Sequence, residues 1–330
     1  MKAIVFDRCG EPGEVLQVRE VPSLEPGPGQ VRVRMLASPI NPSDLLYVRG
    51  LYGKPATLPA TPGFEGVGIV EASGGGFLGW RVMSKRVAVL KRGGNWQEQT
   101  VVPALQAIPV PHDLPVEQAA TFFVNPASVI VMTRYVLRVP PGAWLLQTAA
   151  GSALGRMIIR LGKREGFRTI NVVRRREQVD ELLRAGAEAV ICSGDESIPE
   201  RVLAITNGAG VRFAIDAVGG ATGSAVIQSL GAHGRLLVYG TLAMETMTVD
   251  PRVLMANHKT VEGFWLSEWV ARQSKLTMLR LIRRIGALMR AGVVTSEVGA
   301  SFSLNQIKEA VRQAEQPGRQ GKVLLRISAP

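Results

Sequence analysis

The residues with the clearest chemical potential lie between Trp144 and Arg176. An apolar run at 144–146 leads into small residues at 149–153, and Gly155 and an amphipathic segment follow. This order predicts a strand, a tight turn and a helix. Small residues let the backbone approach a pyrophosphate, whose charge the N–H groups at a helix start stabilise. The expected dinucleotide contacts are Ala150, Gly151, Ser152, Leu154 and Gly155.

A second strand is expected at Thr169–Val173, and three arginines follow it: Arg174, Arg175 and Arg176. An Asp or Glu at this point binds a free ribose 2′-hydroxyl, whereas cations suit a 2′-phosphate. We therefore expect NADPH rather than NADH as the ligand. The alternative is a solvated helix start, but cations there oppose the helix dipole.

The glycine pattern alone is a weak signal. A strict G-x-G-x-x-G is absent, because its three positions are Ala150, Ser152 and Gly155. The alternative interpretation is an ordinary βαβ crossover in which small residues serve only close packing.

The chain has two regions with different sequence patterns, and the elements that they form must position these residues. Residues 1–119 are rich in Pro and Gly and contain short alternating strands, which predicts a compact β domain. From about residue 120, strands alternate with helices, which predicts a parallel sheet covered on both faces. The expected strands of the second region are Trp144–Gln147, Thr169–Val173, Ala189–Cys192, Arg212–Asp216 and Arg235–Tyr239, and the expected helices include Arg176–Ala185, Ala221–Leu230 and Met278–Arg290. Residues 294–330 return to strand-like patterning and end in Lys322–Ile327.

Composition limits the class of protein. The chain has 330 residues, of which 46% are hydrophobic and 20% charged, as in a globular protein. It has no apolar run of about 18 residues, so no membrane partner is expected. The N-terminus has no apolar core of a secretory signal. Cys9 and Cys192 are far apart, which favours a reducing, cytoplasmic location without disulfides.

The formal net charge of +12 leaves two interpretations. One is nucleic-acid binding. However, the basic residues are spread along the chain, and no aromatic residues interleave with them as stacking platforms. A field that attracts anionic ligands is the preferred interpretation, and no nucleic-acid partner is expected.

Several motifs resemble the medium-chain dehydrogenase/reductase superfamily over essentially the whole chain. They are NPSD at Asn41–Asp44, GLYGKPATLPATPGFEG at Gly50–Gly66, FVNP at Phe123–Pro126, RTINVVRRR at Arg168–Arg176 and GFWLSEW at Gly263–Trp269. Within the superfamily the chain looks most like the 2-enoyl thioester (trans-2-enoyl-CoA) reductases of its zinc-free branch. One departure is Arg175, where the family more often has an acid.

The resemblance implies an α/β protein with two domains. Residues 1–119 with 296–330 correspond to a GroES-like catalytic domain, and 120–295 to a Rossmann-type dinucleotide-binding domain with a doubly wound parallel sheet. Zinc-dependent members carry Gly-His-Glu near Gly63-Phe64-Glu65. Phe64 cannot bind a metal, and His112, His233 and His258 are isolated, so no metal is expected.

The implied chemistry is reduction of a C=C bond conjugated to a carbonyl. A hydride adds to the β-carbon, charge develops on the carbonyl oxygen, and a proton reaches the α-carbon. In the resembling family a tyrosine in the loop after NPSD is catalytic, and the matching position is Tyr52. The alternative is a loop tyrosine that only packs its ring. Tyr47 is the nearest rival.

Other candidates follow from position. Asn125 corresponds to a residue near the nicotinamide, although Asn-Pro is also a common turn. Tyr239 and Gly240 end a sheet strand, where doubly wound folds place ligand contacts. Phe264 and Trp265 could line the site or serve packing. The apolar segment Thr260–Leu266 suits an exposed sheet edge, and the family pairs such edges, so a homodimer is expected.

These observations predict an NADPH-dependent, zinc-free reductase of 2-enoyl thioesters in fatty acid metabolism, acting on enoyl-CoA or enoyl-acyl carrier protein. A zinc-free NADPH:quinone oxidoreductase of the same fold is the alternative among enzymes. A non-catalytic NADPH- or nucleic-acid-binding protein is the alternative from another class.

Overall fold

The computed structural model describes residues 1–53 and 55–329, and the chain divides into two compact units. Unit 1 comprises Met1–Val124 and Ser296–Pro330, and unit 2 comprises Asn125–Thr295. Lys54, inside the Gly50–Gly66 motif, and Pro330, at the end of the predicted 296–330 segment, lie outside the described residues. Among the described residues, no helix is long and apolar enough to cross a bilayer.

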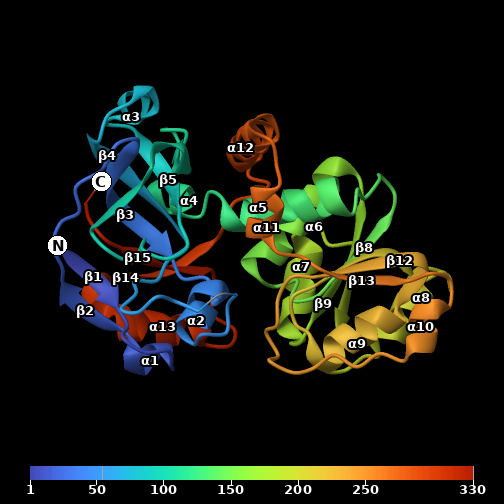
Figure 1. The fold of residues 1–330 in the computed structure, drawn as a ribbon. Coiled ribbons are helices and arrows are strands. Elements are labelled where there is room, and N and C mark those ends of the chain that lie inside the picture. Colours follow the sequence, from blue (N-terminus) through green and yellow to red (C-terminus); the bar gives the residue numbers. More distant parts are fainter. Residues whose placement is uncertain (54, 330) are drawn as a thin grey trace. The chain divides into compact units, whose positions relative to one another are not determined.

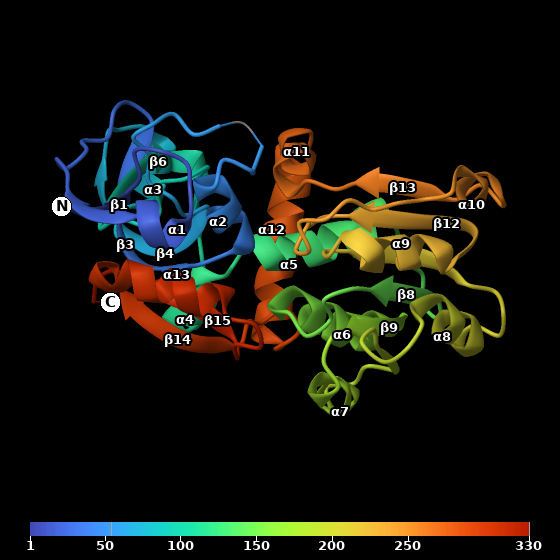
Figure 2. The same cartoon turned by 90° about the horizontal axis from the view of Figure 1, so that it is seen from below.

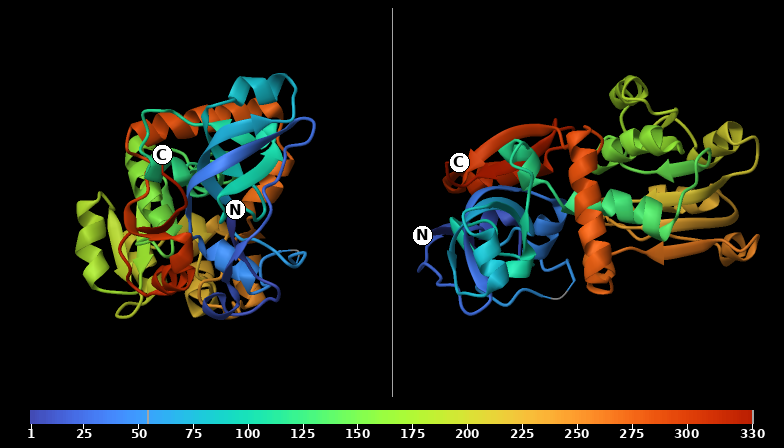
Figure 3. Two further views of the ribbon diagram at one scale, coloured as in Figure 1. Left: turned by 90° about the vertical axis from the view of Figure 1, so that its left-hand side faces the viewer. Right: turned by 90° about the horizontal axis from the view of Figure 1, so that it is seen from above.

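Unit 1 is built on a seven-stranded sheet that is mostly antiparallel. Its strands, in spatial order, are β14 (Val298–Ser303), β15 (Lys322–Arg326), β3 (Gln30–Pro39), β4 (Glu65–Ser73), β5 (Arg86–Leu90) and β7 (Ala107–Pro109), and β6 (Gln99–Pro103) pairs with β3. A separate antiparallel pair is formed by β1 (Lys2–Val5) and β2 (Gln17–Glu20). Figure 3 shows the red C-terminal segment among the blue N-terminal segments of this unit.

The alternation of residue types explains the core of unit 1. In β3 the side chains of Val31, Val33 and Met35 are buried, while those between them are only half-buried. The helices of the unit are short: α1 (Pro12–Val15), α2 (Pro42–Val48), α3 (Phe77–Val82), α4 (Val116–Ala120) and α13 (Ile307–Glu315), with 3₁₀ turns η1 (Ala104–Gln106) and η3 (Leu304–Gln306). The sequence predicts strand-like structure after residue 294, but the structure has a helix there, α13. That helix buries a stripe at 307, 310, 311 and 314, which is helical spacing.

Unit 2 contains a six-stranded parallel sheet. Its strands, in spatial order, are β10 (Ala189–Cys192), β9 (Arg168–Val173), β8 (Trp144–Gln147), β11 (Val211–Asp216), β12 (Leu230–Val238) and β13 (Thr260–Gly263). Figure 2 shows β9, β8, β12 and β13 following one another in this order. The predicted doubly wound parallel sheet is therefore confirmed.

Helices alternate with these strands, as expected (Figure 1). They are α5 (Val124–Ile130) continued by a π-helical turn η2 (Val131–Val136), α6 (Ala153–Glu165), α7 (Glu177–Arg184), α8 (Ile198–Ile205), α9 (Gly220–Gln228), α10 (Pro251–Met255), α11 (Leu266–Ala271) and α12 (Lys275–Arg290). The predicted helix over 221–230 ends earlier, at Gln228, and β12 begins at Leu230 instead of Arg235. The strand is longer because Val211 pairs with Leu230 ahead of a register shift.

Candidate functional site

The strand order of unit 2 reverses between β8 and β11, which are direct neighbours. From β8 the chain moves outward through β9 to β10, and from β11 it moves the other way through β12 to β13. Loops that leave two such strands diverge and open a crevice at their carboxyl ends, where open α/β sheets bind ligands. The segments after these strand ends are therefore the candidate site in unit 2.

A buried polar pair joins the two strands at this reversal. Thr148 follows β8 and donates its hydroxyl to Asp216, the last residue of β11, with an O–O distance of 2.5 Å. Asp216 also accepts the N–H groups of Val218 at 3.0 Å and Gly219 at 2.8 Å. Hydrogen bonds of this kind are strong in a low-dielectric interior, so the carboxylate fixes the start of the loop that follows β11.

Thr148, Asp216 and the loop at 217–220 are not among the site residues that the sequence predicts. The sequence does contain a sign of this loop, because an acidic residue ends a predicted strand and the pair Gly219-Gly220 follows within four residues. Both glycines have a positive φ, +75° and +54°, which larger residues rarely adopt.

The turn after β8 brings the backbone unusually close to helix α6. A Cβ on Gly155 would lie 2.5 Å from the carbonyl oxygen of Ala150, so only glycine permits this approach. Ala149 has a φ of +50°, which tightens the turn. Ser152 caps α6, because its Oγ accepts the Gly155 N–H at 3.1 Å. The N-terminus of a 13-residue helix, with its positive dipole end, therefore follows directly on the small-residue turn.

The three predicted arginines lie in the segment between β9 and α7. Arg174 and Arg176 are exposed and Arg175 is half-buried. Within the described part of the chain, the side chains of Arg174 and Arg176 make no hydrogen bond or ion pair. Their guanidinium groups are thus available to an anion at the carboxyl edge of the sheet, beside the turn that contains Gly151.

Other arginines hold the fold together instead. Arg156 pairs with Glu181 at 2.8 Å, Arg160 donates to the Val293 carbonyl oxygen at 2.9 Å, and Arg284 pairs with Glu165. These contacts all lie within unit 2, so part of the positive charge serves tertiary structure.

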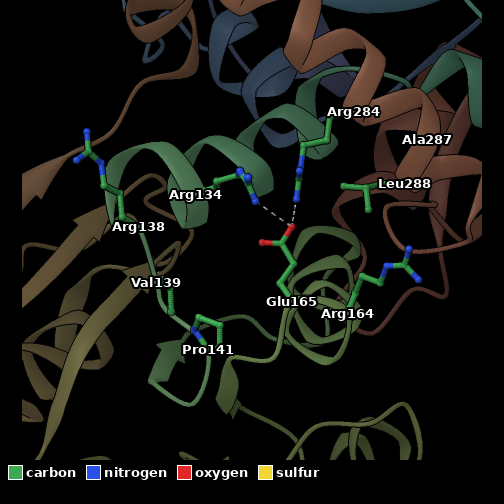
Figure 4. A pocket seen from close by; sticks show the side chains of 9 residues that line it. All are labelled: Arg134, Arg138, Val139, Pro141, Arg164, Glu165, Arg284, Ala287 and Leu288. Carbon is green, nitrogen blue, oxygen red and sulfur yellow. Dashed lines mark hydrogen bonds and ion pairs between the residues drawn. The ribbon is translucent and has the colours of Figure 1, made fainter.

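One hollow in unit 2, of about 690 Å³, is formed around Glu165. It is lined by Arg134, Arg138, Val139, Pro141, Arg164, Glu165, Arg284, Ala287 and Leu288. Figure 4 shows Arg134 and Arg284 pointing toward Glu165, whereas Arg138 and Arg164 point away from it. Glu165 ends α6, and the candidate turn begins that helix, so this hollow lies at the opposite edge of the sheet.

The remaining predicted residues of unit 2 follow the ends of β12 and β13. The Tyr239 N–H donates to the Asp216 carbonyl oxygen at 2.8 Å, and the Phe264 N–H to that of Val238, also at 2.8 Å. Gly240 packs so closely on the loop after β11 that a Cβ there would lie 2.7 Å from the Ala217 carbonyl oxygen. Burial raises the pKa of the Tyr239 hydroxyl, which stays protonated at neutral pH. Trp265, the residue after Phe264, is exposed.

Asn125 lies in the first turn of α5 and is half-buried. In unit 1, the Glu65 carboxylate accepts the N–H groups of Phe123 at 3.3 Å and Val124 at 2.8 Å, the residues that lead into this helix. An acidic group at a helix start is favourable, so Glu65 anchors the chain just ahead of Asn125.

Unit 1 holds the predicted catalytic tyrosine in an aromatic cluster. The ring of Tyr52 is half-buried and lies 5.2 Å from that of Phe64. Phe64 also contacts Tyr47 at 5.3 Å, and Tyr47 meets Phe6 edge-on at 5.8 Å. Tyr47 is buried in the core, where burial raises the pKa of its hydroxyl. The rival tyrosine is therefore the less accessible of the two.

A buried polar network holds Phe64 in place. Asp44 accepts the Asn41 N–H at 2.7 Å and the Phe64 N–H at 2.9 Å, and so ties α2 to Phe64, the residue just before β4. Asn41 in turn donates to Glu65 at 3.1 Å and accepts a hydrogen bond from Lys322. Burial raises the pKa of Asp44 to about 7. Burial likewise raises the pKa of Glu65 and lowers that of Lys322.

Asp44→Asn should lower the free energy of unfolding by about 1–3 kcal/mol. Each carboxylate oxygen of Asp44 accepts one backbone N–H, and the substitution replaces one of these acceptors with an NH₂ group, which cannot accept. The measurement is urea unfolding at neutral pH, read as a lower midpoint with an unchanged slope. Ser43→Ala, on the adjacent and half-buried position, is the matched control and should stay within about 0.5 kcal/mol of wild type. Equal midpoints for Asp44→Asn and wild type would contradict the prediction.

The expectation that no metal is bound rests on Phe64, whose side chain has no ligand atom. Across residues 1–53 and 55–329, no group of three or more His, Cys, Asp or Glu side chains could hold a metal ion. The expectation that the histidines are isolated is wrong for His233 and His258, which stack on one another with ring centroids 5.6 Å apart. Metal independence nevertheless stays a prediction.

Activity should survive exhaustive dialysis against a chelator, because Phe64 offers no ligand atom for zinc. The measurement is turnover before and after dialysis, combined with elemental analysis. Stoichiometric zinc, together with activity that is lost on its removal and restored by its addition, would disprove this prediction.

Comparison with known proteins decides the family. The model of the alcohol dehydrogenase GroES-like domain matches residues 27–112, and that of the zinc-binding dehydrogenases matches residues 153–307. The human mitochondrial enoyl-[acyl-carrier-protein] reductase is 30% identical over 329 residues, covering 98% of this chain and 88% of that protein. The chain belongs to the medium-chain dehydrogenase/reductase superfamily.

Solved structures of the superfamily agree with this fold. Escherichia coli quinone oxidoreductase complexed with NADPH superposes with a TM-score of 0.90 at 26% identity, covering 98% of this chain and 99% of the other. The Etr1p/NADP/crotonyl-CoA complex superposes with a TM-score of 0.85 at 25% identity, with the same coverage. The predicted α/β fold with a GroES-like part is thereby confirmed, and the chain is an oxidoreductase of this superfamily.

Proposed function

We propose that this chain is an NADPH-dependent reductase of the C=C bond of 2-enoyl thioesters, either enoyl-CoA or enoyl-acyl carrier protein, in fatty acid metabolism in the cytoplasm. The observation that carries the proposal is the 30% identity, over 98% of the chain, to an enoyl-[acyl-carrier-protein] reductase. The crotonyl-CoA complex among the similar structures supports the same class of substrate.

The carboxyl edge of the parallel sheet fits NADPH. Gly155 and Gly240 are positions where a Cβ would collide with backbone, so close backbone packing is built into this edge. The capped N-terminus of α6 suits a pyrophosphate, and Arg174 and Arg176 suit a 2′-phosphate. We assign the cofactor to Ala150, Gly151, Ser152, Leu154, Gly155, Arg174, Arg175 and Arg176, with Asn125, Tyr239, Gly240, Phe264 and Trp265 toward the nicotinamide.

The proposed domain roles follow from these assignments. Residues 120–295 bind the dinucleotide, and residues 1–119 with 296–330 supply the catalytic tyrosine. When bound, NADPH supplies the hydride that adds to the substrate β-carbon.

Tyr52 has two roles in the proposed reaction. Its hydroxyl donates a hydrogen bond to the thioester carbonyl oxygen, where charge develops, and delivers a proton to the α-carbon. Phe64 supports the ring from one side, and Asp44 fixes the Phe64 backbone. This arrangement provides a neutral hydrogen-bond donor for the developing charge.

Quinone reduction is the second candidate, because a quinone oxidoreductase superposes with a TM-score of 0.90. Steady-state oxidation of NADPH with crotonyl-CoA and with a benzoquinone separates the two. We expect the larger kcat/KM with crotonyl-CoA. Turnover of the quinone alone would favour the second candidate, and NADPH binding without turnover of either would favour a non-catalytic protein.

The chain should form a homodimer through the β13 edge of unit 2. β13 is the outer strand of the parallel sheet and is mostly exposed. Large apolar side chains near it are also exposed, among them Met255, Val261 and Trp265. An unpaired apolar edge favours association. Light scattering at micromolar concentration should give twice the chain mass, and Val261→Lys should shift it toward the monomer. A wild-type monomer would contradict this prediction.

A further inference from the structure

Helix α3 presents apolar side chains that unit 1 does not use for its own packing. Phe77 is 69% exposed and Trp80 is 73% exposed, and their ring centroids lie 6.2 Å apart. Leu78 on the same helix and Leu105 on the adjacent turn η1 are exposed as well. Single exposed leucines are ordinary on a soluble protein, whereas a contiguous patch with two aromatic rings marks a contact surface.

Local packing explains why these side chains face outward. The helix begins after Gly76, which has a φ of +88°, and its inner side is formed by Gly79 and Val82. A Cβ on Gly79 would lie 2.3 Å from the Ser73 hydroxyl oxygen and 3.5 Å from its Cβ, so this side of the helix packs against the end of the strand. The bulky residues of α3 are therefore left on its outer side. Figure 1 shows this helix at the periphery of unit 1.

The sequence segment that carries the patch contains cations and no acidic residue. Residues 72–97 contain five cations and no Asp or Glu. Arg81 lies on α3 and Lys85 just after it, and both are exposed. Neither side chain has a hydrogen bond or ion pair with another residue in the described ranges. An apolar patch with unpaired cations is complementary to an anionic surface.

We propose that α3 and η1 form a peripheral contact with an anionic lipid bilayer. The apolar side chains enter the headgroup boundary, where Trp and Phe are favoured, and Arg81 and Lys85 contact the headgroups. A second copy of the chain is a poor occupant, because a symmetric contact would bring the same cations face to face. This contact requires no spanning helix, but it departs from the expectation that no membrane takes part.

The test uses full-length protein and sedimented vesicles. Protein should bind vesicles of equal parts phosphatidylglycerol and phosphatidylcholine, and should not bind pure phosphatidylcholine. Phe77→Ser with Trp80→Ser should lower the partition coefficient about tenfold or more. Arg81→Gln with Lys85→Gln should lower it by roughly tenfold or more. The control, Lys275→Gln with Arg280→Gln on α12, removes the same charge from exposed positions of unit 2 and should leave binding nearly unchanged.

A second readout separates insertion from simple charge attraction. Anionic vesicles should shift the tryptophan fluorescence of the wild type to the blue. Trp80→Phe keeps an apolar ring, so it should still bind but lose that shift. This variant also tests the contact if the serine variant does not fold.

Three results would overturn the proposal. The first is no binding to anionic vesicles, or binding that the Phe77 and Trp80 substitutions leave unchanged. The second is an equal loss of binding in the α12 control, which would indicate net charge alone. The third is a fall in mass by light scattering for the α3 variant without any effect on vesicles, which would assign the patch to a second copy of the chain.

Discussion

Tyr52→Phe should lower kcat for enoyl thioester reduction by roughly 10²–10³, the range observed when a single transition-state donor is removed. The substitution deletes one hydroxyl and keeps the ring that packs 5.2 Å from Phe64, so the aromatic cluster should be preserved. NADPH binding should stay near wild type, since the proposed phosphate contacts all lie in unit 2. Quinone reduction, if present, should fall much less, because the quinone ring stabilises its own anion.

Tyr47→Phe is the matched control for this experiment. Tyr47 belongs to the same aromatic cluster but is buried, so loss of its hydroxyl should leave kcat within about twofold of wild type. The measurements are kcat with crotonyl-CoA and with a benzoquinone, and the Kd for NADPH, for all three proteins. Unchanged thioester turnover in Tyr52→Phe would remove this residue from the mechanism and favour the quinone alternative.

Arg174→Ala combined with Arg176→Ala should raise KM for NADPH far more than KM for NADH. Each lost charge-assisted contact to the 2′-phosphate should cost about 1.5–3 kcal/mol, which is about tenfold to a hundredfold per arginine. Both side chains are exposed and without a partner in the described chain, so their removal should not disturb the fold.

The control for cofactor choice is Arg280→Ala with Arg283→Ala, which removes two exposed cations from α12 instead. That variant should change KM slightly and by the same factor for NADPH and NADH, because it alters only the overall positive potential of the protein. The prediction fails if wild-type protein binds NADH at least as tightly as NADPH, or if the α12 variant has the same effect as the Arg174 and Arg176 variant.

The fold was largely predictable because its strongest signals are long and periodic. The strand at Trp144–Gln147 appears with the predicted bounds, and the expected amphipathic helix follows it, since buried parallel strands are apolar runs with clear turn residues on either side. Helix α2 escaped notice because seven residues carry too little periodicity, and a capping box at Asn41 and Asp44 defines it instead. Helix α13 did carry helical spacing, but the surrounding strands of the C-terminal segment obscured it.

The candidate site was predictable only where its residues are neighbours in the sequence. The turn at Ala150–Gly155 and the arginines after β9 stand next to each other in the sequence of a single βαβ unit. Thr148 and Asp216 are 68 residues apart, and their pairing depends on β8 and β11 being neighbours. The contact of Asp44 with Phe64 depends likewise on the fold of unit 1. The predicted roles of these residues still await experiment.

The position of β15 has a consequence for synthesis of the chain. This strand lies inside the sheet of unit 1, paired with β3, and it carries Lys322, which bonds to Asn41 beside Asp44 and Glu65. During translation the whole of unit 2 leaves the ribosome before Lys322 does, and domains generally fold as units. Unit 2 can therefore fold while unit 1 still lacks an internal strand and the cation nearest its two buried acids. The N-terminal segment must wait, partly assembled, for the last residues of the chain.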